Sequence, residues 1–230
     1  MKNKILTTLT ILGAMSYANA MDIQKAPEPK KEKARTSLNL YVTATEASKY
    51  LEANKNAVLV DVRSPGELKF IGAASRMDIH VPFMMVDTSK YNEKQGAYAM
   101  KKNKYAIDEI VFELDKKSVK KDEAIFITCR SGSTRAAPVV NALAKKGYTN
   151  VWTITDGFEG DKAKDGQYKG ERVVNGWLHS DLAWSWKVPS DKLWFECKYK
   201  DLMPKEDALK CSMWEFLKIE TFKVSILREN

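Results

Sequence analysis

The chain has 230 residues, of which 44% are apolar, and a formal net charge of +8 at pH 7. This length predicts one domain, alone or with an extension, that can bury a core. The modest positive charge suits small anionic substrates or acidic partner proteins, and no interleaving of aromatic and basic residues indicates a nucleic-acid interface. Three cysteines and two histidines without ligand spacing argue against a metal site.

The first 20 residues have the pattern of a secretory signal peptide. A short basic start precedes an apolar run from Ile5 to Met15, and residues 18–20 form a small-residue cleavage site. Because the run is too short to cross a bilayer of about 30 Å, we expect no stable membrane insertion but a periplasmic or secreted protein. Residues 21–37 are rich in charge and contain two prolines, which predicts a flexible lead-in.

The next segments are expected to be scaffold. Thr43 and Glu46 have the spacing of a capping box and predict a short helix. Residues 57–62 are almost uniformly apolar, as in a parallel strand buried on both faces. Asp61 and Arg63 fall at the end of this strand, where they can form a structural ion pair or line a crevice beyond the carboxyl ends of the strands.

The middle of the chain carries little functional signal. A strand is expected at Ile79–Val81, and we interpret His80 within it as a structural residue. Residues 89–121 are rich in lysine, which we interpret as a solvated face, with steering of anions as the alternative. Within this stretch, residues 106–114 have the apolar spacing of a helix.

The strongest functional signal is AIFITCRSGST, residues 124–134. Its first half has the length and composition of a buried strand, and a helix is expected from residue 136, so Cys129 lies where a strand meets a helix. Loop N–H groups, the helix N-terminus and the side chains of Arg130 and Arg135 would stabilise a thiolate there. The alternative is an inert buried thiol, but burying two arginines for packing alone would be costly.

Two further segments complete the expected fold. Residues 136–146 are predicted to form a helix that ends at Gly147, and residues 151–155 are predicted to form a strand. Strands that alternate with helices in this way predict an α/β fold with a parallel sheet and helices on both faces.

Beyond residue 161 the composition changes. Five of the six tryptophans lie in the tail, residues 162–230: Trp177, Trp184, Trp186, Trp194 and Trp214. We expect this tail to pack on the domain and extend its core; a platform for an acceptor protein, or a lid over Cys129, is the alternative. Cys197 and Cys211 would pair as a disulfide in an oxidising compartment, which leaves Cys129 unpaired.

Three blocks of sequence resemble a rhodanese-like sulfurtransferase domain over residues 38–161. They are LVDVRSPGEL (residues 59–68), the CRSGST loop that begins at Cys129, and GYTNVWTITDGFEGD (residues 147–161). The resemblance implies a rhodanese-like sheet flanked by helices. It also implies that three residues support the fold and the catalytic loop: Asp61, Arg63 and Glu67.

The resemblance further implies sulfur transfer through Cys129. This residue would take sulfane sulfur from a small anionic donor, thiosulfate or polysulfide, and pass it from a persulfide to a nucleophilic acceptor. No cofactor is implied. The donor would bind the loop residues, with the two arginines orienting it through charged hydrogen bonds: Arg130, Ser131, Gly132, Ser133, Thr134 and Arg135.

Two other functions fit parts of the sequence. Arg135 follows Cys129 by six positions, which is the C-x5-R spacing of cysteine-based phosphatases and suits a tetrahedral oxyanion such as phosphate or arsenate. Against a phosphatase or arsenate reductase, CRSG is the sulfurtransferase form of the loop, and no general acid is evident. The third hypothesis is a non-catalytic sulfur carrier that delivers its persulfide to a partner enzyme through the tryptophan-rich tail.

Overall fold

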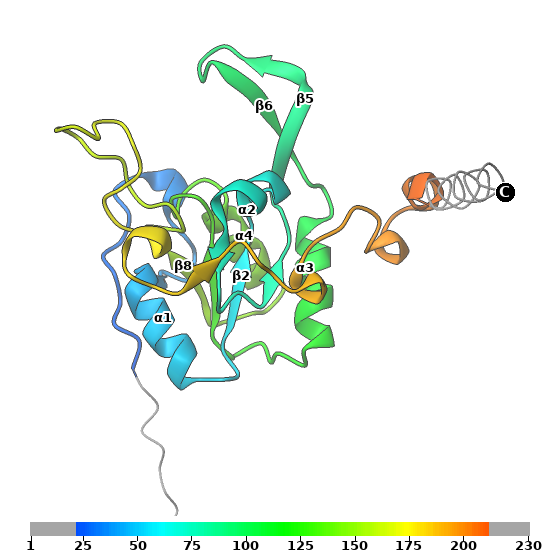
Figure 1. Cartoon of the computed structure of the whole chain (residues 1–230). Helices are drawn as coiled ribbons and strands as arrows, with labels where there is room; N and C mark the ends of the chain where they lie inside the picture. The colour runs from blue at the N-terminus through cyan, green and yellow to red at the C-terminus, as the bar shows by residue number, and fades with distance from the viewer. Residues whose placement is uncertain (1–21, 212–230) are drawn as a thin grey trace, which may run out of the picture.

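The computed structural model describes residues 22–211 (Figure 1). The predicted signal peptide and Trp214 therefore lie outside the described residues. Within the described range, no helix combines the length and the apolar character that crossing a membrane requires.

A parallel sheet of five strands forms the centre of the molecule, in the order β1-β8-β7-β2-β4. The strands are β1 (Tyr41–Val42), β2 (Val58–Asp61), β4 (Ile79–His80), β7 (Ile125–Thr128) and β8 (Val151–Ile154). Parallel neighbours need crossover connections, which here are mostly helical. The predicted α/β fold is confirmed.

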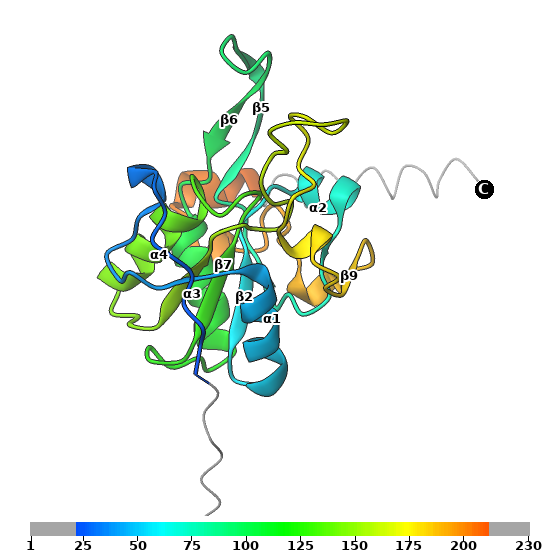
Figure 2. The ribbon, with the colours of Figure 1, turned by 90° about the vertical axis from the view of Figure 1, so that its left-hand side faces the viewer.

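Helices cover both faces of the sheet (Figure 2). One face carries α3 (Ala106–Lys116) and α4 (Ala136–Lys145), and the other carries α1 (Ala44–Ala53) and α2 (Pro65–Ile71). Successive side chains of a strand point to opposite faces. In β7, Ile125 and Ile127 accordingly join the core under α3 and α4, whereas Phe126 packs in the core that contains Leu51 of α1.

The two short helices on the α1 side begin at side-chain caps. Thr43 accepts a hydrogen bond from the N–H of Glu46 (3.3 Å), as its spacing predicted. The helix α2 was not predicted, although the sequence contains signals for its N-terminus. Pro65 occupies the first turn, and Glu67 accepts a hydrogen bond from the N–H of Ser64 (2.8 Å).

The charged lead-in differs from the expectation. Residues 22–37 were expected to be flexible, yet this segment lies along the domain. Ala26 donates its N–H to the carbonyl of Tyr41 in β1 (2.8 Å), Ile23 packs against the core of the α1 face, and a short 3-10 helix, η1, covers Glu32–Ala34. Small apolar side chains between the charges are enough to anchor it.

The lysine-rich middle segment contains a hairpin that the sequence did not reveal. Strands β5 (Met84–Asn92) and β6 (Ala97–Lys102) pair antiparallel and stand clear of the sheet in both views (Figures 1 and 2). Tyr91 and Tyr98 are more than half exposed, so neither face of the hairpin has an apolar periodicity imposed by a core. The predicted helix that follows is present as α3.

The tail beyond residue 161 packs on the α1 face. Strand β9 (Trp184–Ser185) pairs antiparallel with β3 (Ala73–Ala74), and the 3-10 helix η2 (Trp177–His179) precedes it. Trp177 is 1% exposed and donates its indole N–H to the carbonyl of Ala183 (3.0 Å). This tryptophan therefore belongs to the hydrophobic core of the domain.

The tail then reaches α3, past the 3-10 helices η3 (Ser190–Lys192) and η4 (Lys200–Leu202). Trp194 donates its backbone N–H to Nδ1 of His80 (3.3 Å) and its indole N–H to the buried Glu109 (3.1 Å). Tyr199 is buried and donates its hydroxyl to Glu113 (3.0 Å). Polar groups of α3 thus anchor the tail.

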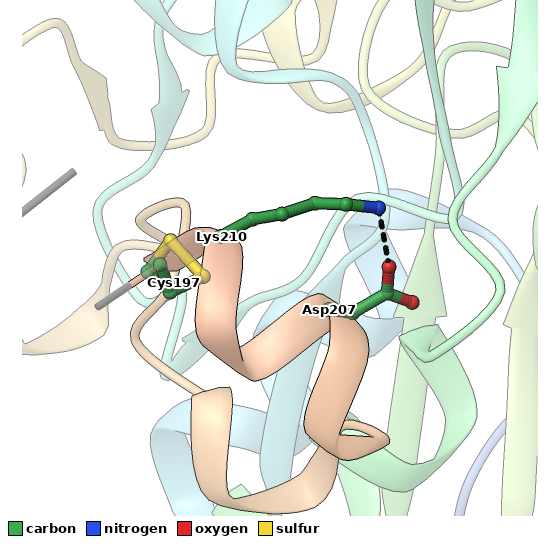
Figure 3. The surroundings of a disulfide bond; sticks show 4 residues. Cys197, Asp207 and Lys210 are labelled. Carbon is green, nitrogen blue, oxygen red and sulfur yellow. Dashed lines mark hydrogen bonds and ion pairs between the residues drawn. A yellow bond between two sulfur atoms is a disulfide. The ribbon is translucent and has the colours of Figure 1, made fainter. Parts of the chain in front are cut away.

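The end of the described tail is closed by the expected disulfide between Cys197 and Cys211 (Figure 3). Asp207, which lies between them in sequence, binds Lys210 (2.9 Å) and reaches the domain through Lys104 (2.6 Å). The bridge and these exposed ion pairs hold the last turn in place.

Replacing both Cys197 and Cys211 by serine should loosen the end of the tail and leave the domain folded. A bridge that closes a loop of this size is worth about 3 kcal/mol to the structure that it closes, and since both of its cysteines lie at the end of the tail, we expect the loss to be confined to that end. Limited proteolysis with mass spectrometry should show faster cleavage after Lys198 and Lys200, with an almost unchanged melting temperature. Cooperative unfolding of the whole domain would contradict this.

The buried His80 should make stability depend on pH. Its Nε2–H donates to the carbonyl of Arg63 (2.9 Å) and its Nδ1 accepts from Trp194, while burial lowers its pKa below the usual 6.5. Between the lowered pKa and 6.5, His80 therefore binds a proton in the unfolded chain but not in the folded chain. The contribution of His80 is complete above pH 6.5 and is lost as the pH falls from there toward the lowered pKa.

Urea unfolding between about pH 5 and pH 8 measures this contribution. His80→Gln, which keeps a donor and an acceptor but does not titrate, should flatten the fall in unfolding free energy on the acid side. His179→Gln, at the chain's other histidine, is the matched control. Equal slopes in the two variants would count against the assignment.

Candidate functional site

Cys129 lies at the carboxyl edge of the central sheet. It directly follows β7, and Thr128 pairs with Asp61 at the end of β2, so the two conspicuous sequence blocks meet at one edge. Cys129 is a free cysteine and is only 1% exposed. The loop of residues 130–135 leads from it into α4, as the sequence predicted.

The backbone of this loop leaves its donors unused. The N–H groups of residues 130–134 donate to no acceptor within residues 22–211. Gly132 has a φ of +63°, and a Cβ on it would lie 2.1 Å from the carbonyl oxygen of Thr155, so only glycine fits. A curved loop with free N–H groups can hold an anion.

A segment after β8 supports the start of the loop. The N–H groups of Phe158 and Glu159 donate to the carbonyls of Cys129 (2.8 Å) and Arg130 (2.9 Å). A Cβ on Gly157 would lie 2.5 Å from the carbonyl oxygen of Cys129. The close approach of the backbone of residues 157–159 therefore fixes the position of Cys129.

Arg135 is held by Glu67 of α2. Its Nη1 and Nη2 donate to the two carboxylate oxygens (2.6 and 2.7 Å), and both side chains are largely buried. Burial acts to raise the pKa of Glu67, but the hydrogen bonds and charge of Arg135 outweigh it and lower this pKa to about 2. The pair uses only part of the guanidinium's N–H donors.

Arg130 is paired as well, with Glu159 (2.9 Å). The arginine side chain is 52% exposed and the glutamate side chain 8% exposed. Glu159 was missed by the sequence reasoning, although it lies within the GFEGD end of the third sequence block. An acidic residue in that block, in a protein with two arginines in the Cys129 loop, is the signal that could have pointed to this pair.

Asp61 and Arg63 form a fully buried ion pair (2.7 Å) behind the loop. Arg63 also donates to the carbonyl of Gly72 (2.8 Å), and its guanidinium stacks over the ring of Phe158 (3.8 Å). The pair therefore supports the segment on which Cys129 rests. Within the described residues, no group of three or more His, Cys, Asp or Glu side chains is arranged to hold a metal ion.

The pairing of Arg135 predicts that its removal affects stability strongly. Arg135→Ala leaves the buried carboxylate of Glu67 with its hydrogen bonds from Ser64 but without a positive charge beside it, and should lower the unfolding free energy by about 3 kcal/mol at pH 7. The loss should shrink as the pH falls below 4.5, because Glu67 contributes its stability above that value and loses it toward its lowered pKa of about 2.

Urea unfolding at neutral and acid pH measures this loss. Lys146→Ala, which breaks an ion pair with Asp108 (2.9 Å) in which both side chains are exposed, is the control and should lower stability by about 1 kcal/mol or less. Losses of equal size in the two variants would show that Glu67 does not depend on Arg135.

Several known proteins resemble this chain in sequence. The sequence profile of the rhodanese-like domain matches residues 43–164. The uncharacterized protein RP600 of Rickettsia prowazekii is 31% identical over 143 residues, which are 62% of this chain and 94% of that protein. The uncharacterized protein RC0915 of Rickettsia conorii is 28% identical over 144 residues, with the same coverage.

Two solved structures align with parts of this chain. The crystal structure of Rv0390 from M. tuberculosis aligns with a TM-score of 0.45 and 25% identity, covering 64% of this chain and 97% of that chain. The polysulfide-sulfur transferase homodimer of Wolinella succinogenes aligns with a TM-score of 0.35 and 20% identity, covering 52% and 68%. Since the domain profile matches more than half of the sequence, this chain belongs to the rhodanese-like domain family.

Proposed function

We propose that this protein is a sulfurtransferase that holds sulfane sulfur as a persulfide on Cys129. The observation that supports this most is the position of the free cysteine, at the end of β7 and the start of a loop whose N–H groups have no acceptor within the described residues. Membership of the rhodanese-like family supports the same chemistry.

The reaction has two nucleophilic steps. The thiolate of Cys129 attacks the outer sulfur of a donor, the S–S bond of the donor breaks, and the leaving group takes the electron pair: sulfite from thiosulfate, or a shortened chain from polysulfide. A thiolate acceptor then attacks the outer sulfur of the Cys129 persulfide, and Cys129 leaves as a thiolate. No external oxidant or reductant is needed.

The loop contributes by stabilising negative sulfur. In both steps the charge is shared between the sulfur of Cys129 and the transferred sulfur, close to the N–H groups of residues 130–134. These donors are fixed before the reaction, because the segment 157–159 and Gly132 hold the loop in place.

The second candidate is reduction or hydrolysis of an oxyanion through the C-x5-R spacing of Cys129 and Arg135. The guanidinium of Arg135 keeps N–H donors beyond the two that bind Glu67. The 1% exposure of Cys129 favours transfer of a single sulfur atom over reaction with a bulky phosphate ester.

The proposal extends to where the protein works. The signal-peptide pattern and the disulfide between Cys197 and Cys211 both suit an oxidising compartment, so we place the protein in the periplasm or outside the cell. An acceptor protein that docks on the tail, for example at the 64% exposed Trp186, would make the protein a carrier as well as an enzyme.

Incubation with thiosulfate or polysulfide should add about 32 mass units, one sulfur atom, to the intact protein. Dithiothreitol should remove the added sulfur. Cys129→Ser should abolish this gain, because it removes the nucleophile, and should leave the fold intact. The double variant Cys197→Ser/Cys211→Ser is the control and should gain the sulfur normally.

The same experiment separates the two candidates. If no donor adds sulfur, while phosphate or arsenate protects Cys129 from alkylation, the oxyanion function replaces sulfur transfer. Sulfur gain that persists in Cys129→Ser would move the chemistry to another residue.

A further inference from the structure

Each arginine of the Cys129 loop is paired with a carboxylate. Arg135 binds Glu67 through two hydrogen bonds (2.6 and 2.7 Å), and Arg130 binds Glu159 through one (2.9 Å). The charges of these side chains cancel within each pair. The loop therefore offers its backbone dipoles to a donor but little net positive charge from its own arginines.

The two carboxylates differ in what else they do. Glu67 caps α2 through Ser64 and fixes Arg135, so its charge has a structural task. Glu159 has one oxygen, Oε2, on Arg130, while Oε1 is buried and has no hydrogen-bond partner within the described residues. Burying a carboxylate oxygen without a partner is unfavourable.

The ion pair of Glu159 does not offset that penalty. Arg130 is half exposed, and ion pairs with exposed partners stabilise proteins little. A glutamine at position 159 could accept the same hydrogen bond without burying a charge. The negative charge of Glu159 therefore does not stabilise the fold. We look for its role in the function of the site.

Two further charged residues are close to Glu159 in the chain. Arg172 donates to the carbonyl of Gly160, and Asp161 follows Glu159 by two positions. The N–H groups of Phe158 and Glu159 bind the carbonyls of Cys129 and Arg130, which keeps the segment alongside the loop.

Donors of different charge would respond differently to this arrangement. Thiosulfate carries two negative charges and must approach a thiolate, so it gains most from a free arginine and loses most from a nearby carboxylate. An organic persulfide carries a single negative charge on its sulfur, or none when protonated. For such a donor the charge at position 159 matters much less.

We propose that Glu159 sets the donor preference of Cys129: by neutralising Arg130 it disfavours thiosulfate and leaves the site to organic persulfides with at most one net negative charge. The inference rests on the proposed sulfur transfer. Glu159 is a specificity-determining residue that acts through Arg130 and not by touching the reacting sulfur.

The step with a persulfide donor balances without a further reagent. The thiolate of Cys129 attacks the outer sulfur of R–S–SH and forms the new S–S bond. The bond between the two sulfur atoms of the donor breaks, and R–S⁻ leaves with the electron pair. The proton stays on the transferred sulfur or passes to the departing thiolate.

The test compares the rate constants with which thiosulfate and cysteine persulfide add sulfur to Cys129, followed by intact mass and by release of sulfite or cysteine. Glu159→Gln should raise the rate constant for thiosulfate by about three- to tenfold at low salt, since it removes one negative charge near a doubly charged donor. The gain should fade as salt rises from about 0.01 to 1 M. The rate constant for cysteine persulfide should stay within about twofold.

Two further variants make the test specific. Asp161→Asn removes an exposed negative charge two residues along and should leave the preference between the donors unchanged. Arg130→Gln in the Glu159→Gln background should cancel the gain with thiosulfate, because no arginine is then released.

The outcomes distinguish this inference from the proposed function. Slower transfer from both donors in Glu159→Gln, or a gain with thiosulfate that salt does not affect, would show a structural role and overturn the inference. Equal reactivity of the parent protein toward both donors would also overturn it. Failure of every donor to add sulfur to Cys129 would overturn sulfur transfer itself.

Discussion

The close contact between two backbones underlies the whole site. Gly132 and Gly157 let the loop after β7 and the segment after β8 approach so closely that a Cβ on either residue would overlap main-chain atoms. The N–H groups of Phe158 and Glu159 can then bind the carbonyls of Cys129 and Arg130. The segment after β8 thus binds carbonyl groups of the loop, whereas the N–H groups of residues 130–134 remain free to bind an anion. A static cradle of this kind needs no rearrangement when charge moves between sulfur atoms.

Much of the fold could be predicted because its information is local. The strands β2, β7 and β8 are short apolar runs, and the helices between them show apolar spacing, so a parallel α/β sheet follows from the sequence. The β5–β6 hairpin could not be predicted, because its side chains are not packed in a core and its sequence therefore lacks an alternating apolar pattern. The lead-in was mistaken for a flexible segment because a few anchoring contacts outweigh its charged composition.

The site could be predicted only where it is contiguous. Cys129 and its loop form one stretch of sequence, and their position after a strand indicated an anion cradle. The partners of the arginines could not be predicted, because Glu67 is 68 residues from Arg135 and Glu159 is 29 residues from Arg130. The sequence predicts that both arginines bind the sulfur donor, but in the structure each of them binds a glutamate. Here stability and recognition compete for the same side chains.

The segments outside the family match have a consequence for how the sheet is protected. The lead-in lies along β1 through Ala26, and the tail lies against β4 through Trp194 and through Lys192, whose ammonium donates to the carbonyl of Met77 (2.7 Å). Open edge strands invite pairing with other chains. A chain trimmed to residues 43–164 would lack β1 itself, would expose β8 and β4 as edge strands and would lose Trp177 from its core, so it would tend to aggregate. The folding unit is therefore larger than the family domain.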